Sequence, residues 1–194
     1  MAFGLARHAQ LREGEWVLVM GAAGALGSCA VQVAKHLGAR VVAAAGSPER
    51  VRVALDLGAD AGIDYRREDL AAEVMRVTGG EGVGVVFENI GDPELWPGAF
   101  DSLGQGGRLV TVGAHAGGVV PLDIKRLYWS SLRVIGGLGG TEPGDVERAL
   151  ELTAAGTFRV LVDRVLSLRE VAEAHRLVAD RELLGKVILD PTLE

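Results

Sequence analysis

Residues 17–28 read VLVMGAAGALGS, an apolar run that opens into a turn with three glycines. The run is almost wholly apolar, which is typical of a strand buried on both faces of a parallel sheet. After the turn, Leu26, Ala30 and Val33 recur at helical spacing. The stretch therefore predicts a strand that passes through a glycine-rich turn into a helix, the local structure that cradles a dinucleotide.

The usual dinucleotide fingerprint is G-x-G-x-x-G, and residues 22–27 depart from it at the first position. They read A-x-G-x-x-G, with Gly21 one residue before the expected glycine. We expect Gly24 to let the backbone approach the phosphates and Gly27 to let the helix pack closely on the strand. The N–H groups that start the helix would bind the pyrophosphate. An ordinary glycine-rich turn without a ligand is the alternative.

The rest of the chain alternates between strand and helix patterns. Strands are expected at residues 16–20, 40–45, 63–65, 83–88, 107–112, 132–136, 160–162 and 186–189. Helices are expected between them, over 48–58, 70–77, 95–103, 122–130, 146–153 and 171–178. Such alternation predicts an α/β fold of the Rossmann type, a doubly wound parallel sheet with helices on both faces. Glycines follow several of these strands, and ligands bind at the carboxyl ends of parallel strands.

Composition excludes several functions. The 194 residues carry a net charge of −6 and no run of Lys or Arg, so neither nucleic acid nor an anionic membrane surface is an expected partner. The start of the chain lacks the features of a signal peptide, and no apolar stretch is long enough to span a membrane, so a cytoplasmic location is expected. The four histidines have no metal-ligand spacing, and no metal site is predicted. Cys29 is expected to be a buried structural thiol, and His175 a packing residue on an apolar stripe.

The residues after the second strand indicate which dinucleotide would bind. Residues 44–47 read AAGS, and no carboxylate follows before Glu49, whereas NAD binding would need an acidic side chain for the ribose hydroxyl. Ser47 as a donor and Arg50 as a cation would suit the 2′-phosphate of NADP(H). Tyr65, followed by Arg66, would close the same pocket. The alternatives are that Arg50 is only a solvated helix residue and Tyr65 only a half-buried strand aromatic.

The sequence resembles the C-terminal, cofactor-binding half of the medium-chain dehydrogenase/reductase superfamily, in its quinone oxidoreductase-like branch. The resemblance rests on residues 21–28, 45–50, 63–70, 106–113 and 185–189 and spans nearly the whole chain. It implies that Gly24, Ala25, Leu26 and Gly27 hold the pyrophosphate, that Gly46, Ser47, Arg50 and Tyr65 face the ribose phosphate of NADP(H), and that Gly91, Gly113, Ala114 and Leu138 approach the nicotinamide. The implied activity is hydride transfer between NADPH and a quinone, enone, aldehyde or alcohol.

Members of that superfamily carry a β-rich, GroES-like catalytic domain before this point, and residues 1–194 are expected to form the NADP(H)-binding domain alone. The missing domain builds most of the substrate cleft and holds the catalytic zinc of the zinc-dependent members. We therefore expect no catalytic residue in this chain, and a small-molecule substrate only in the presence of a catalytic domain. The resemblance also implies that the last strand returns to that missing domain.

Rival functions remain open to different degrees. A non-catalytic NADP(H)-binding module is consistent with every residue above. A methyltransferase that binds S-adenosylmethionine would need an acidic residue after the second strand, and residues 44–47 contain none. A short-chain dehydrogenase would need Tyr-x-x-x-Lys, whereas Asp69 and Leu132 lie four residues after the two tyrosines.

Residues 132–136, LRVIG, fall at a sheet edge in the strand order that the resemblance implies. An apolar edge strand exposes unpaired backbone groups and invites pairing. The sequence therefore predicts a homodimer in which the edge strands Leu132–Gly136 of two copies pair.

Overall fold

A six-stranded parallel sheet forms the centre of the molecule. The computed structural model describes residues 1–138, 140–180 and 183–193. Its strands are β1 (Trp16–Met20), β2 (Arg40–Ala45), β3 (Ala61–Asp64), β4 (Val83–Glu88), β5 (Leu103–Thr111) and β6 (Arg133–Gly136). They lie in the order β3-β2-β1-β4-β5-β6, and every neighbouring pair is parallel. The predicted doubly wound fold is confirmed, with β6 at one edge.

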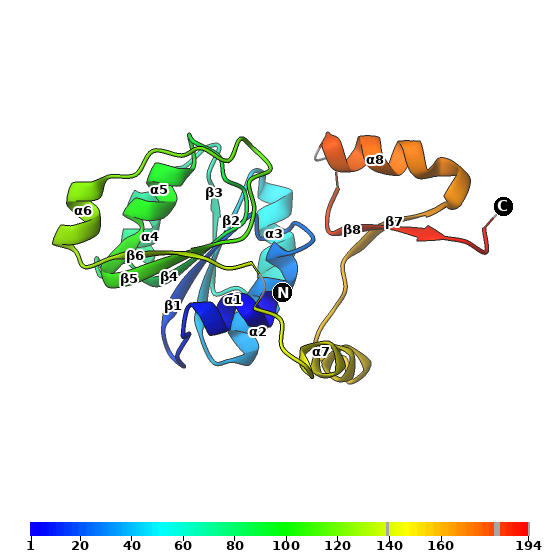
Figure 1. Cartoon of the computed structure of the whole chain (residues 1–194), viewed down its shortest axis with the longest axis horizontal. Helices are drawn as coiled ribbons and strands as arrows, with labels where there is room; N and C mark the ends of the chain where they lie inside the picture. The colour runs from blue at the N-terminus through cyan, green and yellow to red at the C-terminus, as the bar shows by residue number, and fades with distance from the viewer. Residues whose placement is uncertain (139, 181–182, 194) are drawn as a thin grey trace.

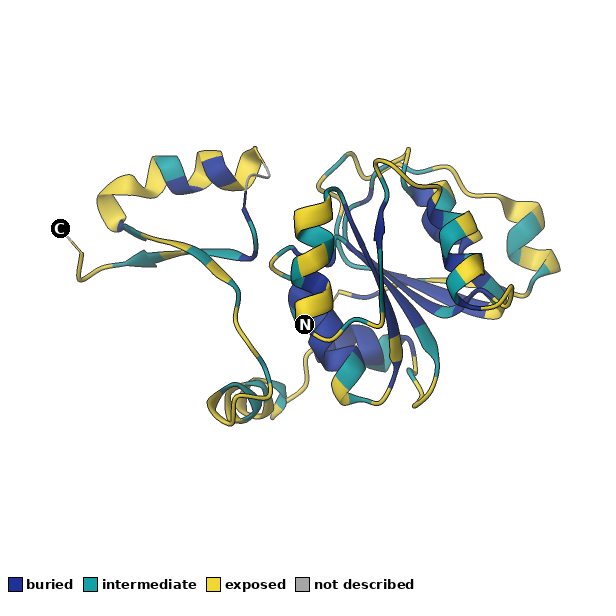
Figure 2. Ribbon diagram, turned by 180° about the vertical axis from the view of Figure 1, so that it is seen from behind, coloured by how far each residue is buried: buried dark blue, intermediate teal, exposed yellow. Residues whose placement is uncertain are grey.

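Helices cover both faces of this sheet (Figure 1). The helices α1 (Ala2–His8), α2 (Gly27–His36) and α3 (Pro48–Asp56) pack on one face, and α4 (Leu70–Val77), α5 (Trp96–Asp101) and α6 (Ile124–Trp129) pack on the other. Side chains alternate along β1, so Val17 and Val19 enter the first apolar cluster while Leu18 and Met20 enter the second. The strands β1, β2 and β4 are accordingly buried over most of their length (Figure 2).

The C-terminal part forms a smaller unit. It comprises β7 (Val162–Ser167), the 3-10 turn η1 (Leu168–Glu170), α8 (Val171–Ala179) and β8 (Lys186–Asp190). The preceding helix α7 (Asp145–Ala154) packs on the first apolar cluster of the main domain through Ala149 and Leu152. Strands β7 and β8 pair in parallel as a separate two-stranded sheet, to one side of the main sheet in Figure 1. The start of β8 remains attached to the main domain, because Gly185 forms a parallel bridge with Gly24.

Several boundaries differ from the expected ones. Strand β5 begins at Leu103 rather than 107, because Leu103 pairs with Val83 before the register shifts along β4. Strand β7 occupies Val162–Ser167 rather than 160–162. Helix α1 had no counterpart in the sequence prediction, since it is only seven residues long and lacks a side-chain N-cap.

Two side-chain expectations were wrong. Cys29 is half-buried rather than buried, and its Sγ donates to the carbonyl oxygen of Ala25 at 3.5 Å. His175 is exposed, because helix α8 buries only Ala174 and Leu177.

In the part of the chain that the structure describes, no helix is both long and apolar enough to cross a membrane. The same residues contain no group of three or more His, Cys, Asp or Glu side chains arranged to hold a metal ion.

Candidate functional site

The glycine-rich turn between β1 and α2 has a backbone that tolerates no larger residue at two points. Gly21 adopts a left-handed conformation with φ of +60°, which favours glycine. A Cβ on Gly27 would overlap the Gly21 carbonyl oxygen and lie 2.9 Å from the Cα of Ala22. A Cβ on Gly24 would lie 3.2 Å from the same Gly21 oxygen. The turn is therefore folded tightly on itself. Gly21, rather than residue 22, takes the role of the first glycine of the fingerprint, because it adopts the left-handed conformation.

Helix α2 begins from this turn without a side-chain cap. Leu26 stands at its N-cap position and is half-buried, while Ala25 is exposed. The first N–H groups of an uncapped helix carry a partial positive charge and suit an anion. The structure thus places Gly24, Ala25, Leu26 and Gly27 around one potential anion site.

A lysine from the far end of the chain lies at the same turn. The ammonium group of Lys186 donates to the carbonyl oxygen of Ala25 at 3.0 Å, and the N–H of Gly185 donates to the carbonyl of Ala23 at 3.0 Å. Lys186 was not among the predicted site residues. No local pattern indicates this contact, because it joins positions 161 residues apart.

The ends of β2 and β3 form a basic corner. The Ser47 hydroxyl oxygen accepts from the backbone N–H of Arg50 at 3.3 Å and caps α3, which leaves its own O–H to donate elsewhere. A Cβ on Gly46 would lie 3.0 Å from the Tyr65 hydroxyl oxygen and 3.2 Å from Nε of Arg66. The structure therefore brings Gly46 and Tyr65 together beside the start of α3, where Ser47 and Arg50 lie.

An open, largely apolar pocket of about 570 Å³ lies at the ends of β4, β5 and β6. It brings together four predicted residues, Gly91, Gly113, Ala114 and Leu138. Gly91 has a φ of +66°, and a Cβ on it would lie 2.7 Å from the Cα of Ala114. The wall of the pocket therefore depends on close backbone packing between the ends of β4 and β5.

A buried carboxylate supports that wall. Glu88, the last residue of β4, is 3% exposed. One of its oxygens accepts from the N–H groups of Ile90 and Gly91, at 2.7 and 2.9 Å. The other accepts from the hydroxyl of Thr111 at 3.0 Å, and Thr111 itself lines the pocket. This pair was missed from the sequence, because two residues on neighbouring strands give no local signal.

The twelve predicted site residues thus all lie at the carboxyl ends of β1 to β6. The glycine turn is at β1, the basic corner at β2 and β3, and the pocket at β4, β5 and β6. The strand order reverses between β1 and β4, which is the topological switch point where ligands of such sheets bind.

Comparison with known proteins identifies the family. Residues 25–155 match the family model described as zinc-binding dehydrogenase. Quinone oxidoreductase-like protein 2 from Bos taurus is 32% identical over 196 residues, covering 96% of this chain and 56% of the relative. The chain spans little more than half the length of the curated relatives it matches.

Two solved structures agree closely with the fold. A structure of an NAD-dependent alcohol dehydrogenase has a TM-score of 0.89 and 33% identity, covering 97% of this chain and 55% of that one. The Escherichia coli quinone oxidoreductase complexed with NADPH has a TM-score of 0.83 and 27% identity, covering 98% of this chain and 63% of that one. The chain therefore belongs to the zinc-binding dehydrogenase family of the medium-chain dehydrogenase/reductase superfamily, and it corresponds to the C-terminal, cofactor-binding domain of that superfamily.

Proposed function

We propose that this chain binds NADP(H) and forms the nucleotide-binding part of an NADPH-dependent oxidoreductase. The proposed reaction is hydride transfer between NADPH and a quinone, enone, aldehyde or alcohol. The observation that carries this proposal is the arrangement along the carboxyl ends of the strands, where the basic corner at β2 and β3, the glycine turn at β1 and the apolar pocket at β4 to β6 follow one another. This order matches the 2′-phosphate ribose, the pyrophosphate and the nicotinamide along NADP(H). The Escherichia coli quinone oxidoreductase, a relative with the same fold that forms a complex with NADPH, supports the choice of cofactor.

Each part of the cofactor has a place along these strand ends. The pyrophosphate would lie on residues 24–27, where the N terminus of α2 offers N–H groups. Lys186 adds a positive charge beside the same turn. The ribose 2′-phosphate would lie at Gly46, Ser47, Arg50 and Tyr65, and the nicotinamide in the pocket between Gly91, Gly113, Ala114 and Leu138.

We expect the chain to bind NADPH more tightly than NADH, because only NADPH carries the phosphate that Ser47 and Arg50 would contact. Replacing Arg50 with Ala should weaken NADPH binding by about 1.5–3 kcal/mol, the worth of a charge-assisted hydrogen bond, and leave NADH binding nearly unchanged. Isothermal titration of both proteins with both cofactors measures this difference.

Arg52→Ala is the matched control, since Arg52 lies in the same helix but its side chain is 80% exposed and faces Asp56. It should change neither affinity appreciably. Equal affinity of the unaltered chain for NADPH and NADH would contradict the proposed preference.

We further propose that a second domain completes the substrate cleft. The chain spans 56% of the bovine relative, and the pocket at β4 to β6 is open on one side. In the smaller C-terminal unit, Val162, Val165 and Ile188 expose apolar side chains on the strands β7 and β8. A second domain packed there would cover this surface and place a substrate against the nicotinamide.

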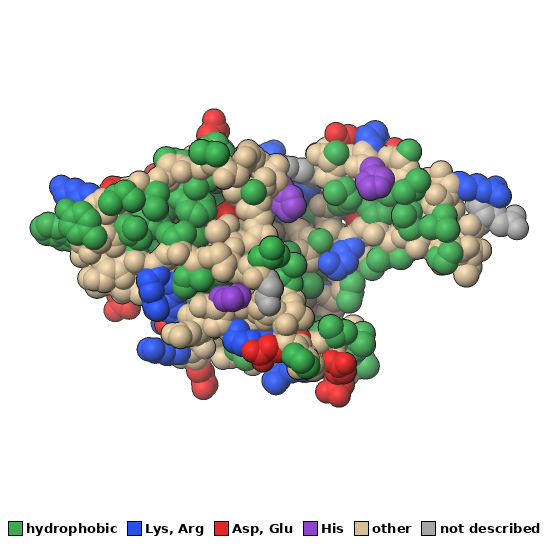
Figure 3. Space-filling model, in the orientation of Figure 1, with side chains coloured by type: hydrophobic (Ala, Val, Ile, Leu, Met, Phe, Trp, Pro, Cys, Tyr) green, Lys and Arg blue, Asp and Glu red, His purple; other side chains and the backbone are tan. Residues whose placement is uncertain are grey.

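The edge strand β6 supports a homodimer. Its four residues lie at the end of the sheet with Val134 exposed. The adjacent helix α6 exposes Ile124, Tyr128 and Trp129, the last with 73% of its surface accessible. Figure 3 shows hydrophobic side chains gathered at this end of the molecule. Antiparallel pairing of two β6 strands about a two-fold axis would extend the sheet and bury this surface.

Val134→Pro should convert the dimer to a monomer, because proline removes a backbone N–H or distorts the edge. Val134→Thr keeps the N–H and the strand propensity, so it should remain dimeric. Sedimentation equilibrium at micromolar concentration distinguishes the two. A monomeric unaltered chain, or a dimeric Pro variant, would show that this interface is wrong.

A further inference from the structure

The hydroxyl of Thr111 has a fixed direction. A threonine hydroxyl has one proton to donate and two lone pairs that accept. Here the proton is donated to the Glu88 carboxylate at 3.0 Å. The second carboxylate oxygen is held by two backbone N–H groups, which lock the Glu88 side chain in place. Thr111 can therefore offer only lone pairs to a ligand in the pocket that it lines.

An obligate acceptor in a largely apolar pocket selects for a ligand that donates. A primary carboxamide carries an NH2 group that satisfies such an acceptor, whereas a carboxylate presents only oxygens to it. Resting on the proposed function, which places the nicotinamide in this pocket, we propose that Thr111 accepts a hydrogen bond from the nicotinamide NH2. Glu88 acts as the positioning residue, since it sets the direction of the Thr111 hydroxyl. The pair would make the chain discriminate between the amide cofactor and its nicotinic acid analogue.

The test compares the affinities of the 194-residue chain for NADP+ and for nicotinic acid adenine dinucleotide phosphate. The unaltered chain should bind NADP+ at least about tenfold more tightly, because the acid leaves Thr111 facing another acceptor. Thr111→Val keeps the shape of the side chain but removes the acceptor, so the preference for NADP+ should fall to between about onefold and threefold. Thr111→Ser retains the hydroxyl and should retain the ratio.

Glu88→Gln provides a readout that a purely structural role would not give. The glutamine oxygen can still accept from the two N–H groups, while its NH2 donates to Thr111. The Thr111 hydroxyl proton is then released toward the pocket, and the preference should shift toward the acid analogue. A structural defect would instead weaken the binding of NADP+ and of the acid analogue by the same factor. If this variant fails to fold, the Thr111→Val and Thr111→Ser pair decides the question.

A third ligand separates this inference from the proposed function. 2′-Phospho-ADP-ribose lacks the nicotinamide, so the unaltered chain and all three variants should bind it equally. If the unaltered chain binds neither this compound nor NADP+, the proposed function is wrong. If it binds both, and Thr111→Val keeps the full preference for NADP+ over the acid, the role assigned to Thr111 and Glu88 is wrong.

Discussion

NADPH oxidation by the 194-residue chain alone is expected to run orders of magnitude below the usual enzyme range of about 1–10³ per second. Hydride transfer needs little from protein acids and bases, because the cofactor supplies the chemistry and the protein supplies position and a dry cleft. Positioning a substrate against a reactive group is worth about 7–11 kcal/mol. The pocket at the ends of β4, β5 and β6 is open to solvent, and a wall supplied by the proposed second domain would be needed to hold a substrate there.

Stopped-flow and steady-state measurements with a panel of quinones, enones and aldehydes test this expectation, in samples shown to be saturated with NADPH. The competing explanation for any turnover is that two associated copies rebuild a cleft from His115 and Trp129, which are both exposed. Trp129→Ala and a series of protein concentrations control for that explanation. Turnover in the normal enzyme range by the monomer would contradict our view of the chain as the nucleotide-binding part of an enzyme.

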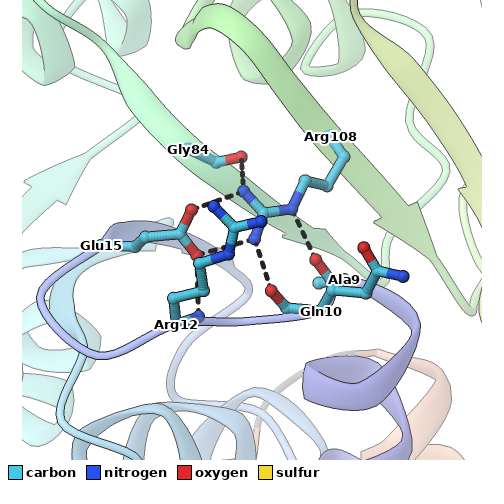
Figure 4. A network of polar contacts seen from close by, with 6 residues as sticks. All are labelled: Ala9, Gln10, Arg12, Glu15, Gly84 and Arg108. Atoms are coloured by element: carbon cyan, nitrogen blue, oxygen red, sulfur yellow. Dashed lines mark hydrogen bonds and ion pairs between the residues drawn. The ribbon is translucent and has the colours of Figure 1, made fainter.

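Arg108→Met is expected to lower the free energy of unfolding by about 3 kcal/mol. This is the lower end of the usual cost of removing one partner of a buried ion pair, because Arg108 is buried but the Glu15 side chain is 21% exposed. Arg108 lies in β5, and its guanidinium contacts Glu15 just before the amino end of β1, away from the candidate site at the carboxyl ends of the strands. Figure 4 shows the groups that surround this guanidinium. It binds both oxygens of Glu15 at 2.7 Å and donates to the carbonyls of Ala9, Gln10 and Gly84. The substitution leaves these acceptors without their donor and loosens the connection between α1 and β1.

Urea denaturation measures the loss, and Arg52→Met serves as the control for removing an arginine. Its exposed side chain makes only a 3.8 Å contact with Asp56, so it should change stability by no more than about 0.5 kcal/mol. Equal effects of the two substitutions would show that the buried network contributes nothing specific.

The same network predicts a pH dependence. Burial opposes ionisation of Glu15, but hydrogen bonds from the Arg108 side chain and the Arg12 backbone N–H, with the charges of both arginines, outweigh it and lower the pKa of Glu15. The unfolded chain therefore takes up this proton at a higher pH than the folded one. The stabilisation is complete above the ordinary glutamate pKa of about 4.3 and is lost as the pH falls through the folded value. Arg108→Met should lose less stability than the unaltered chain over this acid range, and an identical loss in both would contradict the assignment.

The sequence was sufficient for the central sheet because its signals there are local. Strand β2 occupies residues 40–45 as expected, and the Ser47 cap with Pro48 behind it starts α3 where predicted. The glycines that follow the strands also identified the ends of the strands. Contacts between distant segments were not predictable in this way. The approach of Lys186 to Ala25 and the pairing of Glu88 with Thr111 depend on tertiary packing, for which periodicity carries no information.

Amide hydrogen exchange with and without saturating NADPH tests the central claim most directly, because it locates the ligand on the chain. We expect increased protection at residues 24–28, at 46–50 and around 91 and 113–114. Exchange at the amino ends of the strands, around Arg12, Glu15 and Gln105, should remain unchanged and is the internal control. If NADPH protected no residue at the carboxyl ends of the strands, or protected only residues at their amino ends, the proposed binding site would be wrong.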